Sequence, residues 1–159
     1  MNNINLNHDG SHDFDFFYGQ WRVYNRRLTK RLQGCKEWEQ FEGVQECVPL
    51  LGGLGNTDHM LNEAGNTVGW SLRFYNPVLK QWSIYWVGGR DYVLLPPVHG
   101  SFSNGTGQFV GTEEIDGRPI TVKFLWSRMD TDKPHWEQAF SADGGNTWEM
   151  NWEMDFTRV

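Results

Sequence analysis

Hydrophobic and polar residues alternate along most of this chain, and the alternation is clearest close to the C-terminus. Trp148, Met150, Trp152, Met154 and Phe156 occupy every second position there, and the residues between them are acidic or Asn. Successive side chains of a β-strand point to opposite faces, so this pattern predicts a strand with a buried apolar face and an exposed polar face. Similar alternation in earlier segments predicts further strands of the same kind.

Residues that favour turns separate these segments at short intervals. Asp116 and Gly117 form the clearest hairpin signal, because both can adopt the positive φ that a two-residue turn requires. A short helix is predicted within 12–18, ahead of Gly19, where its aromatic residues could plug one end of a barrel. The alternating segments predict about ten strands, near 20–32, 36–48, 54–62, 67–76, 80–87, 97–104, 107–115, 118–127, 134–142 and 147–157.

The predicted fold class is all-β, with an antiparallel up-and-down β-barrel of about ten strands. Consecutive strands joined by tight turns close most economically into a barrel, because closure leaves no exposed sheet edge. A two-sheet sandwich is the alternative, but the long segments 20–32 and 36–48 favour the strongly tilted strands of a barrel. The pattern indicates a flexible polar leader over 1–11 and a single domain over 12–159.

Composition and charge narrow the partners of such a barrel. The chain has 159 residues, nine of them Trp, and a formal net charge of −6. An acidic surface repels phosphate backbones, so we expect no nucleic acid partner. No apolar run is long enough for a membrane-spanning helix, and residues 1–11 lack the apolar stretch of a secretory signal. These features predict a cytoplasmic protein and leave a homodimer open.

The basic segment and the two cysteines are interpreted without a functional role. Residues 26–31 form the one basic cluster, which we interpret as the solvated end of a strand. Cys35 and Cys47 would lie roughly 40 Å apart on one extended strand, whereas a disulfide needs Cα atoms within about 7 Å. We therefore expect two free thiols, in agreement with a reducing compartment. No CxxC or zinc-binding spacing occurs.

Gly19 and Trp21 open the first predicted strand, and Arg158 closes the last one. A Trp at the closed end of a barrel needs a cover, and an Arg guanidinium stacks well on an indole face. This combination resembles the Gly-x-Trp signature and the C-terminal Arg of the lipocalins and the wider calycin superfamily. The pattern from His12 to Phe156 resembles a family of uncharacterised bacterial calycin-like proteins, of the lipocalin and fatty-acid-binding-protein type. The resemblance implies the barrel and structural roles for Gly19 and Trp21, and it supplies no catalytic residues.

Residues 141–148 match the pattern S-x-D-x-G-x-x-W, the Asp-box known from sialidase propellers. In such a turn the Asp and Ser side chains bond turn amides, and the Trp packs beneath. Propellers carry one copy per blade, whereas we find one copy in a chain too short for a propeller. We interpret the segment as a stabilised turn between the last two strands.

The candidate ligand-binding residues are those that the alternation places on the inward face. Their aromatic members would form a stacking surface, and their polar members would need partners, water or a ligand, because an unpaired buried polar group is costly. A buried Glu could act as a general acid or base, which makes Glu42 and Glu113 the catalytic candidates and Gln138 an orienting group. The full set is Asn25, Trp38, Gln40, Glu42, Trp70, Phe74, Trp86, Glu113, Trp126, Trp136 and Gln138.

The remaining charged residues and histidines give weaker indications of a functional site. Asp58 and His59 are neighbours on a predicted strand and therefore point to opposite faces, so they cannot easily share a site. Arg73 and Tyr75 could bind a carboxylate if they faced inward, but the alternation favours the surface for them. None of the five His has a metal-binding spacing, so we expect no metal site. Haem is not expected either, although His135 is the best candidate for an axial ligand.

Three functions fit these observations. The first is binding of a small hydrophobic or aromatic ligand inside the barrel, with no indication of which ligand. The second is a cofactor-free acid–base enzyme, of the isomerase, hydratase or cyclase type, that acts on such a ligand. The third is a carbohydrate- or partner-binding module that uses Trp side chains on the outer surface. A barrel fold by itself does not distinguish them.

Overall fold

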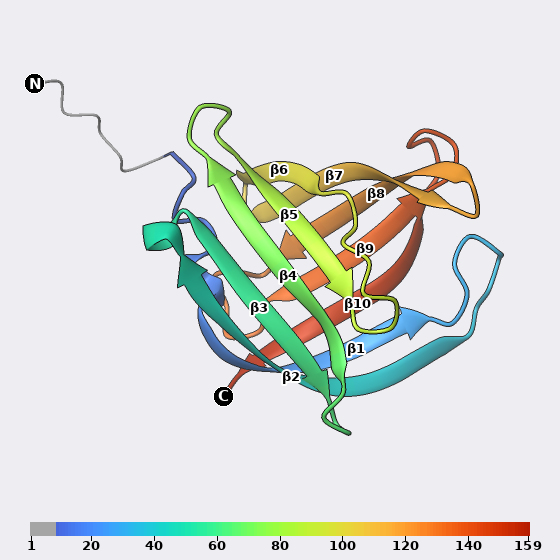
Figure 1. Cartoon of the computed structure of the whole chain (residues 1–159), viewed down its shortest axis with the longest axis horizontal. Helices are drawn as coiled ribbons and strands as arrows, with labels where there is room; N and C mark the ends of the chain where they lie inside the picture. Colours follow the sequence, from blue (N-terminus) through green and yellow to red (C-terminus); the bar gives the residue numbers. More distant parts are fainter. Residues whose placement is uncertain (1–8) are drawn as a thin grey trace, which may run out of the picture.

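The computed structural model describes residues 9–159, so most of the predicted leader over 1–11 lies outside the described residues. Ten strands form one closed antiparallel barrel, in which each strand pairs with the next and β10 pairs with β1 (Figure 1). The predicted up-and-down barrel is confirmed, and the two-sheet sandwich is excluded. The strands are β1 (Gly19–Leu28), β2 (Trp38–Leu50), β3 (Gly55–Asn62), β4 (Thr67–Asn76), β5 (Gln81–Gly88), β6 (Val98–Ser103), β7 (Thr106–Ile115), β8 (Arg118–Ser127), β9 (His135–Ser141) and β10 (Glu149–Arg158).

The short helix predicted within 12–18 is not confirmed, because this segment contains only a single 3-10 turn, η2 (Asp15–Phe17). Acids alternate with Phe here, and that spacing does not give a continuous apolar face at helical periodicity. The turn nevertheless plugs the barrel. Phe14 and Phe17 are fully buried, and Phe14 meets Trp82 edge to face with ring centroids 4.9 Å apart. A second 3-10 turn, η3 (Leu51–Gly53), follows β2. In residues 9–159 no helix is long and apolar enough to cross a membrane.

Trp21 and Arg158 close the plugged end of the barrel. The Arg158 guanidinium lies over the Trp21 ring, 4.1 Å from its centroid. It also donates hydrogen bonds to the carbonyl oxygens of Tyr18 and Phe16, at 2.7 and 2.8 Å. The Trp21 indole N–H donates to the carbonyl of Phe17 at 2.8 Å. The predicted stacking is confirmed, and these contacts form a latch that ties the C-terminal strand to the plug.

Residues 141–148 form the predicted turn between β9 and β10. Asp143 accepts hydrogen bonds from the hydroxyl and the backbone N–H of Thr147. These bonds hold the pKa of Asp143 at about 2. Trp148 packs beneath the turn, and its indole N–H donates to the carbonyl of Gly145 at 3.1 Å. The segment therefore has the structural role that the sequence indicates.

A β-bulge in β10 changes the face of two predicted core residues. The register with β9 shifts between Met150 and Trp152, so Asn151 is an extra residue at that point. Trp152 faces inward, whereas Met150 and Trp148 belong to the outer face, where the Lys123 ammonium lies over the Trp148 ring. The prediction that Trp148 and Met150 share the buried face of Trp152 is wrong, because alternation alone does not reveal an inserted residue.

Replacement of Arg158 by Ala is expected to lower the free energy of unfolding by about 2 kcal/mol, because two charge-assisted hydrogen bonds and a cation–π contact are lost. Urea denaturation followed by circular dichroism measures the change. Arg22→Ala, on the exposed face of β1, is the control and should cost less than about 0.5 kcal/mol. Equal stability of the two variants would contradict the latch.

Candidate functional site

The lumen of the barrel contains two cavities that differ in size and access. A mouth cavity of about 650 Å³ is open to solvent at the end opposite the plug. An inner cavity of about 40 Å³ lies between the mouth and the plug. Trp86, Gln138 and Trp152 line both cavities and therefore form the boundary between them.

The mouth cavity combines an aromatic wall with several charged side chains. The aromatic wall consists of Phe41, Trp86, Phe140 and Trp152, which come from β2, β5, β9 and β10. The charged residues that line the cavity are Arg27, Lys30, Arg31, Glu39, Arg90, Asp91 and Glu113.

The loop between β1 and β2 folds back over the mouth. Leu32 in this loop has a left-handed φ of 57° and packs against the core. Its backbone N–H donates to the Glu149 carboxylate at 2.7 Å. This anchor holds Arg31 against the aromatic wall, where its guanidinium carbon lies 5.4 Å from the ring centroid of Phe140 and 5.9 Å from that of Trp152.

Arg27 is the second arginine of the mouth, and it has a direct partner. Its Nε lies 2.6 Å from the Glu39 carboxylate. Its guanidinium carbon lies 5.0 Å from the ring centroids of Phe41 and Trp152. The interpretation of the basic segment as a solvated strand end is therefore wrong for Arg27 and Arg31, because the strand and the loop after it direct both side chains into the mouth.

Arg31 differs from Arg27 because it forms no ion pair with any of residues 9–159. Burial lowers the pKa of its guanidinium, and the positive charges of Arg27 and Arg90 lower it further. The negative charges of Glu113 and Glu149 oppose this shift without being in contact. The mouth thus contains a half-buried positive charge with no bonded counter-ion.

Glu113 is an acidic residue of the mouth cavity, and its pKa is shifted from the ordinary value. It lies on the inner face of β7 and lines the cavity. Burial raises the pKa of its carboxyl, and the positive charge of Arg31 acts in the opposite direction. A carboxyl group with a raised pKa is suited to accept or donate a proton, and the acid–base role of Glu113 stays a prediction.

One wall of the inner cavity is polar and includes a buried ion pair. Arg73 on β4 and Asp58 on β3 approach to 2.5 Å between Nη1 and Oδ2. The same Nη1 donates to Asn56 Oδ1 at 2.9 Å. Gln45 and Ser71 complete this wall. Because the charges of Arg73 and Asp58 neutralise each other, both side chains can face the lumen.

Among the residues that line the inner cavity, two donors have no hydrogen-bond partner in residues 9–159. They are Nε2 of Gln45 and Nε of Arg73. A cavity of about 40 Å³ has room for roughly three water molecules. The inner cavity can therefore hold water, or the small polar end of a ligand, at these donors.

Six predicted site residues face the lumen, and two of the polar ones bond to other protein groups. Asn25 Oδ1 accepts a hydrogen bond from the Trp152 indole at 2.9 Å. Gln138 Nε2 donates to Asn151 Oδ1 at 2.8 Å. The six residues are Asn25, Trp86, Glu113, Trp126, Trp136 and Gln138.

The predicted inward position is wrong for three residues of β2, namely Trp38, Gln40 and Glu42. Trp38 lies on the outer face, with the Arg26 guanidinium carbon 4.4 Å from its ring centroid. Gln40 and Glu42 are exposed on the same face, and Glu42 lies opposite the exposed Tyr24. The interior positions of β2 are occupied by the intervening residues, which include small and polar types that the alternation rule does not select. Glu42 therefore cannot act with Glu113, which is on the other side of the wall.

The predicted faces of β4 are reversed. Trp70 is 44% exposed and stacks on His59 at a centroid distance of 4.4 Å, and Phe74 also lies on the outer face. Arg73 and Tyr75 are buried in the lumen, so the surface position expected for them is wrong. The reason is that Arg73 finds its counter-charge inside the barrel. The prediction that Asp58 and His59 point to opposite faces is confirmed.

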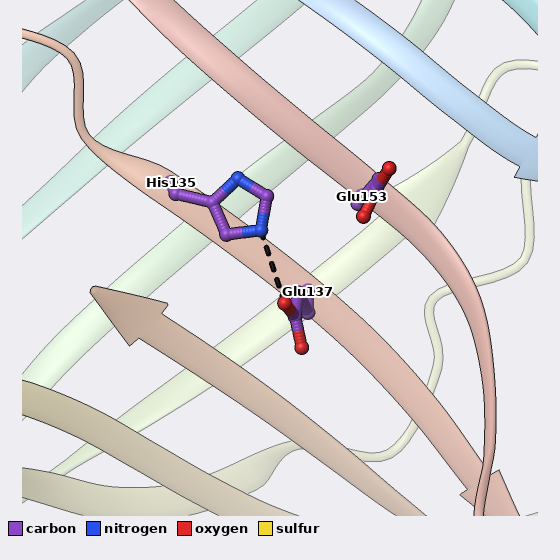
Figure 2. A group of neighbouring side chains, drawn as sticks. All are labelled: His135, Glu137 and Glu153. Atoms are coloured by element: carbon purple, nitrogen blue, oxygen red, sulfur yellow. Dashed lines mark hydrogen bonds and ion pairs between the residues drawn. The ribbon is translucent and has the colours of Figure 1, made fainter. Parts of the chain in front are cut away.

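His135 lies on the outer face of β9 and does not present a ligand atom to the lumen. Figure 2 shows it beside Glu137 and Glu153, and one ligand atom from each lies within 4.8 Å of the others. These donor types occur in zinc sites. However, Arg26 lies 2.5 Å from the Glu153 carboxylate, and His135 Nδ1 is 2.8 Å from Asp155. The three side chains are therefore already engaged, His135 in hydrogen bonds to Asp155 and Glu137, and Glu153 in an ion pair with Arg26.

Sequence reasoning missed the two arginines of the mouth and the buried pair of Asp58 and Arg73. Arg27 lies an even number of residues after Trp21 and Asn25 on the same strand, so the alternation predicts that its side chain points inward as theirs do. Arg31 has no such signal, because its place depends on the loop fold. Asp58 and Arg73 could be found only by comparing the charges on two neighbouring strands.

Comparison of the sequence with protein-family models and with curated proteins gave no match.

Asp58→Asn is expected to lower the free energy of unfolding by about 3–5 kcal/mol, because it leaves the Arg73 charge buried and unpaired. Adding Arg73→Gln to the same chain should recover part of the loss. Urea denaturation gives both values, and Asp116→Asn in an exposed hairpin turn is the matched control. A loss below about 1 kcal/mol for Asp58→Asn would show that the pair does not support the barrel.

The two thiols are expected to differ in reactivity. Burial raises the pKa of the Cys47 thiol to about 12, so it is protonated at about pH 8 and does not react. Cys35 is half-buried, and its hydrogen bond with the Thr29 hydroxyl lowers its pKa. Ellman's reagent should titrate one thiol in the native protein and both after unfolding. Cys35→Ser should abolish the native reaction, and fast reaction of both native thiols would contradict the buried position of Cys47.

Proposed function

We propose that the mouth cavity binds one small molecule with an apolar or aromatic body. The observation that supports this most directly is a cavity of about 650 Å³ with Phe41, Trp86, Phe140 and Trp152 in its wall. Small-molecule sites are concave, typically of roughly 300–1,000 Å³, and mostly apolar with a few polar groups. The mouth has this size and this combination of surfaces.

The arrangement of the lumen supports entry and binding at the mouth. The plug closes the other end with the fully buried Phe14 and Phe17. Trp86 and Trp152 meet edge to face at the boundary, with ring centroids 5.6 Å apart. A ring or acyl chain in the mouth would contact these indoles and gain about 25 cal/mol for each Å² of apolar surface buried.

The fold supports a calycin-like identity as part of the same proposal. The chain forms a closed meander, and Arg158 covers Trp21, as the Gly-x-Trp resemblance implies. Ligand binding inside the barrel would agree with that identity. A cytoplasmic location and a homodimer stay predictions from the sequence.

A cofactor-free acid–base enzyme acting on the same ligand is the second candidate. The observation that favours it is the position of Glu113 in the mouth, where burial raises its pKa. The third hypothesis, a surface platform of Trp side chains, is not supported. Trp70 is the one exposed Trp of the nine, all of which are among residues 9–159, so several coplanar indoles are not presented to a partner.

Binding of the neutral dye N-phenyl-1-naphthylamine tests the proposal. We expect one dye per chain, with enhanced dye fluorescence and quenched Trp emission. Ile115→Trp places an indole in the mouth and should weaken binding at least tenfold, since the indole fills part of the space. Val110→Trp, on the outer face of the same strand, should leave the affinity unchanged. Absence of binding, or equal effects of the two variants, would overturn the proposal.

A further inference from the structure

We infer that the ligand of the mouth cavity is a monocarboxylate and that its carboxylate group binds the guanidinium of Arg31. The inference rests on the proposed function, because it names the chemical class of the molecule that would occupy the same cavity. It is carried by the position of Arg31, by the charges around it and by the aromatic wall that it contacts.

Arg31 is held at the mouth without a protein partner. Its guanidinium has neither an ion pair nor a side-chain hydrogen bond with any of residues 9–159, although it is half-buried against Phe140 and Trp152. A charged group that loses water without gaining a partner is unfavourable. A carboxylate matches the planar fork of a guanidinium and can accept two parallel hydrogen bonds from it. A bound carboxylate would therefore replace the water that Arg31 has lost.

The carboxylates near Arg31 do not already serve as its partner. Glu39 is bonded to Arg27 at 2.6 Å. Glu149 accepts the backbone N–H of Leu32 at 2.7 Å and forms no ion pair with Arg31 within 4 Å. Glu113 acts on Arg31 only through space and forms no ion pair with it within 4 Å. These contacts leave the Arg31 fork available to an incoming anion.

The charge balance of the cavity favours a single negative charge. Arg27, Lys30, Arg31 and Arg90 line the mouth, against the three carboxylates of Glu39, Asp91 and Glu113. Four positive groups minus three negative groups leave a surplus of one. A monoanion would cancel this surplus, whereas a dianion would meet net repulsion from the acidic groups.

The aromatic wall extends directly from Arg31, so one molecule can use both features. The Arg31 guanidinium carbon lies 5.4 Å from the Phe140 ring and 5.9 Å from the Trp152 ring. A carboxylate at the edge of the guanidinium would thus place an attached ring or chain beside these side chains. The expected ligand class is an aromatic or otherwise apolar monocarboxylic acid.

Isothermal titration with 1-naphthoic acid and 1-naphthamide tests the inference, because the two compounds share the ring and differ in charge. We expect the acid to bind the wild-type protein at least tenfold more tightly, which corresponds to about 1.4 kcal/mol. Arg31→Gln should abolish the preference for the acid and leave the affinity for the amide unchanged. Arg22→Gln, on the exposed outer face of β1, should keep the preference.

Glu113→Gln gives a second, independent measurement that does not depend on a change at Arg31. It removes an acidic group from the cavity, so it should strengthen binding of the acid severalfold and leave the amide unchanged. If Arg31→Gln fails to fold, the response to Glu113→Gln decides, and an unchanged affinity for the acid overturns the inference. Equal affinity of the acid and the amide for the wild-type protein also overturns it, while the proposed function stands. Failure of both compounds and of the neutral dye to bind would overturn the proposed function itself.

Discussion

The structure depends on one strand pairing, that of β1 with β10, which joins the two ends of the barrel sequence. Its register sets Trp21 opposite Arg158 at the plugged end and Arg27 opposite Trp152 at the mouth. A slip by one residue would turn every β10 side chain to the other face of the wall, so the latch and the mouth would be lost together. Gly19 permits the close approach, because it has a φ of +106° and a Cβ there would lie 2.9 Å from Arg158 Nη1.

The interior of this barrel is not uniformly apolar, and its polarity changes from one end to the other. The plug end is filled by aromatic rings, such as those of Phe14 and Trp82. The middle carries the neutralised pair of Arg73 and Asp58, and the mouth carries arginines. Charge is therefore compensated in the closed, inner part of the lumen and left available where the cavity opens to solvent. This order is what the cost of burying an unpaired charge requires.

Alternation and turn residues were sufficient to predict the number, order and closure of the strands, because backbone pairing in a meander depends mainly on these local signals. They were not sufficient to predict which face is inward in β2 and β4. The rule that apolar residues face inward fails for Trp70. Arg73, on the opposite face of the same strand, pairs with Asp58 of β3 inside the barrel, and this turns Trp70 outward. Similarly, the bulge at Asn151 depends on tertiary pairing. Six of the eleven candidate site residues were therefore placed on the correct face, while Arg31, whose position depends on a loop, could not be predicted.

The strands and the β1–β2 loop contribute different parts of the mouth cavity, and this arrangement suits the cavity to ligand binding. The aromatic wall is built on paired strands, whose register keeps Phe140 and Trp152 in position. Arg31 is instead carried by a loop that is anchored through Leu32 to Glu149. A rigid apolar surface with a polar group on a connecting loop is a common arrangement in binding proteins, because loops can change without disturbing the scaffold. Leu32 directly follows Arg31 in the chain, so its hydrogen bond to Glu149 connects the loop that carries the guanidinium to the last strand of the barrel.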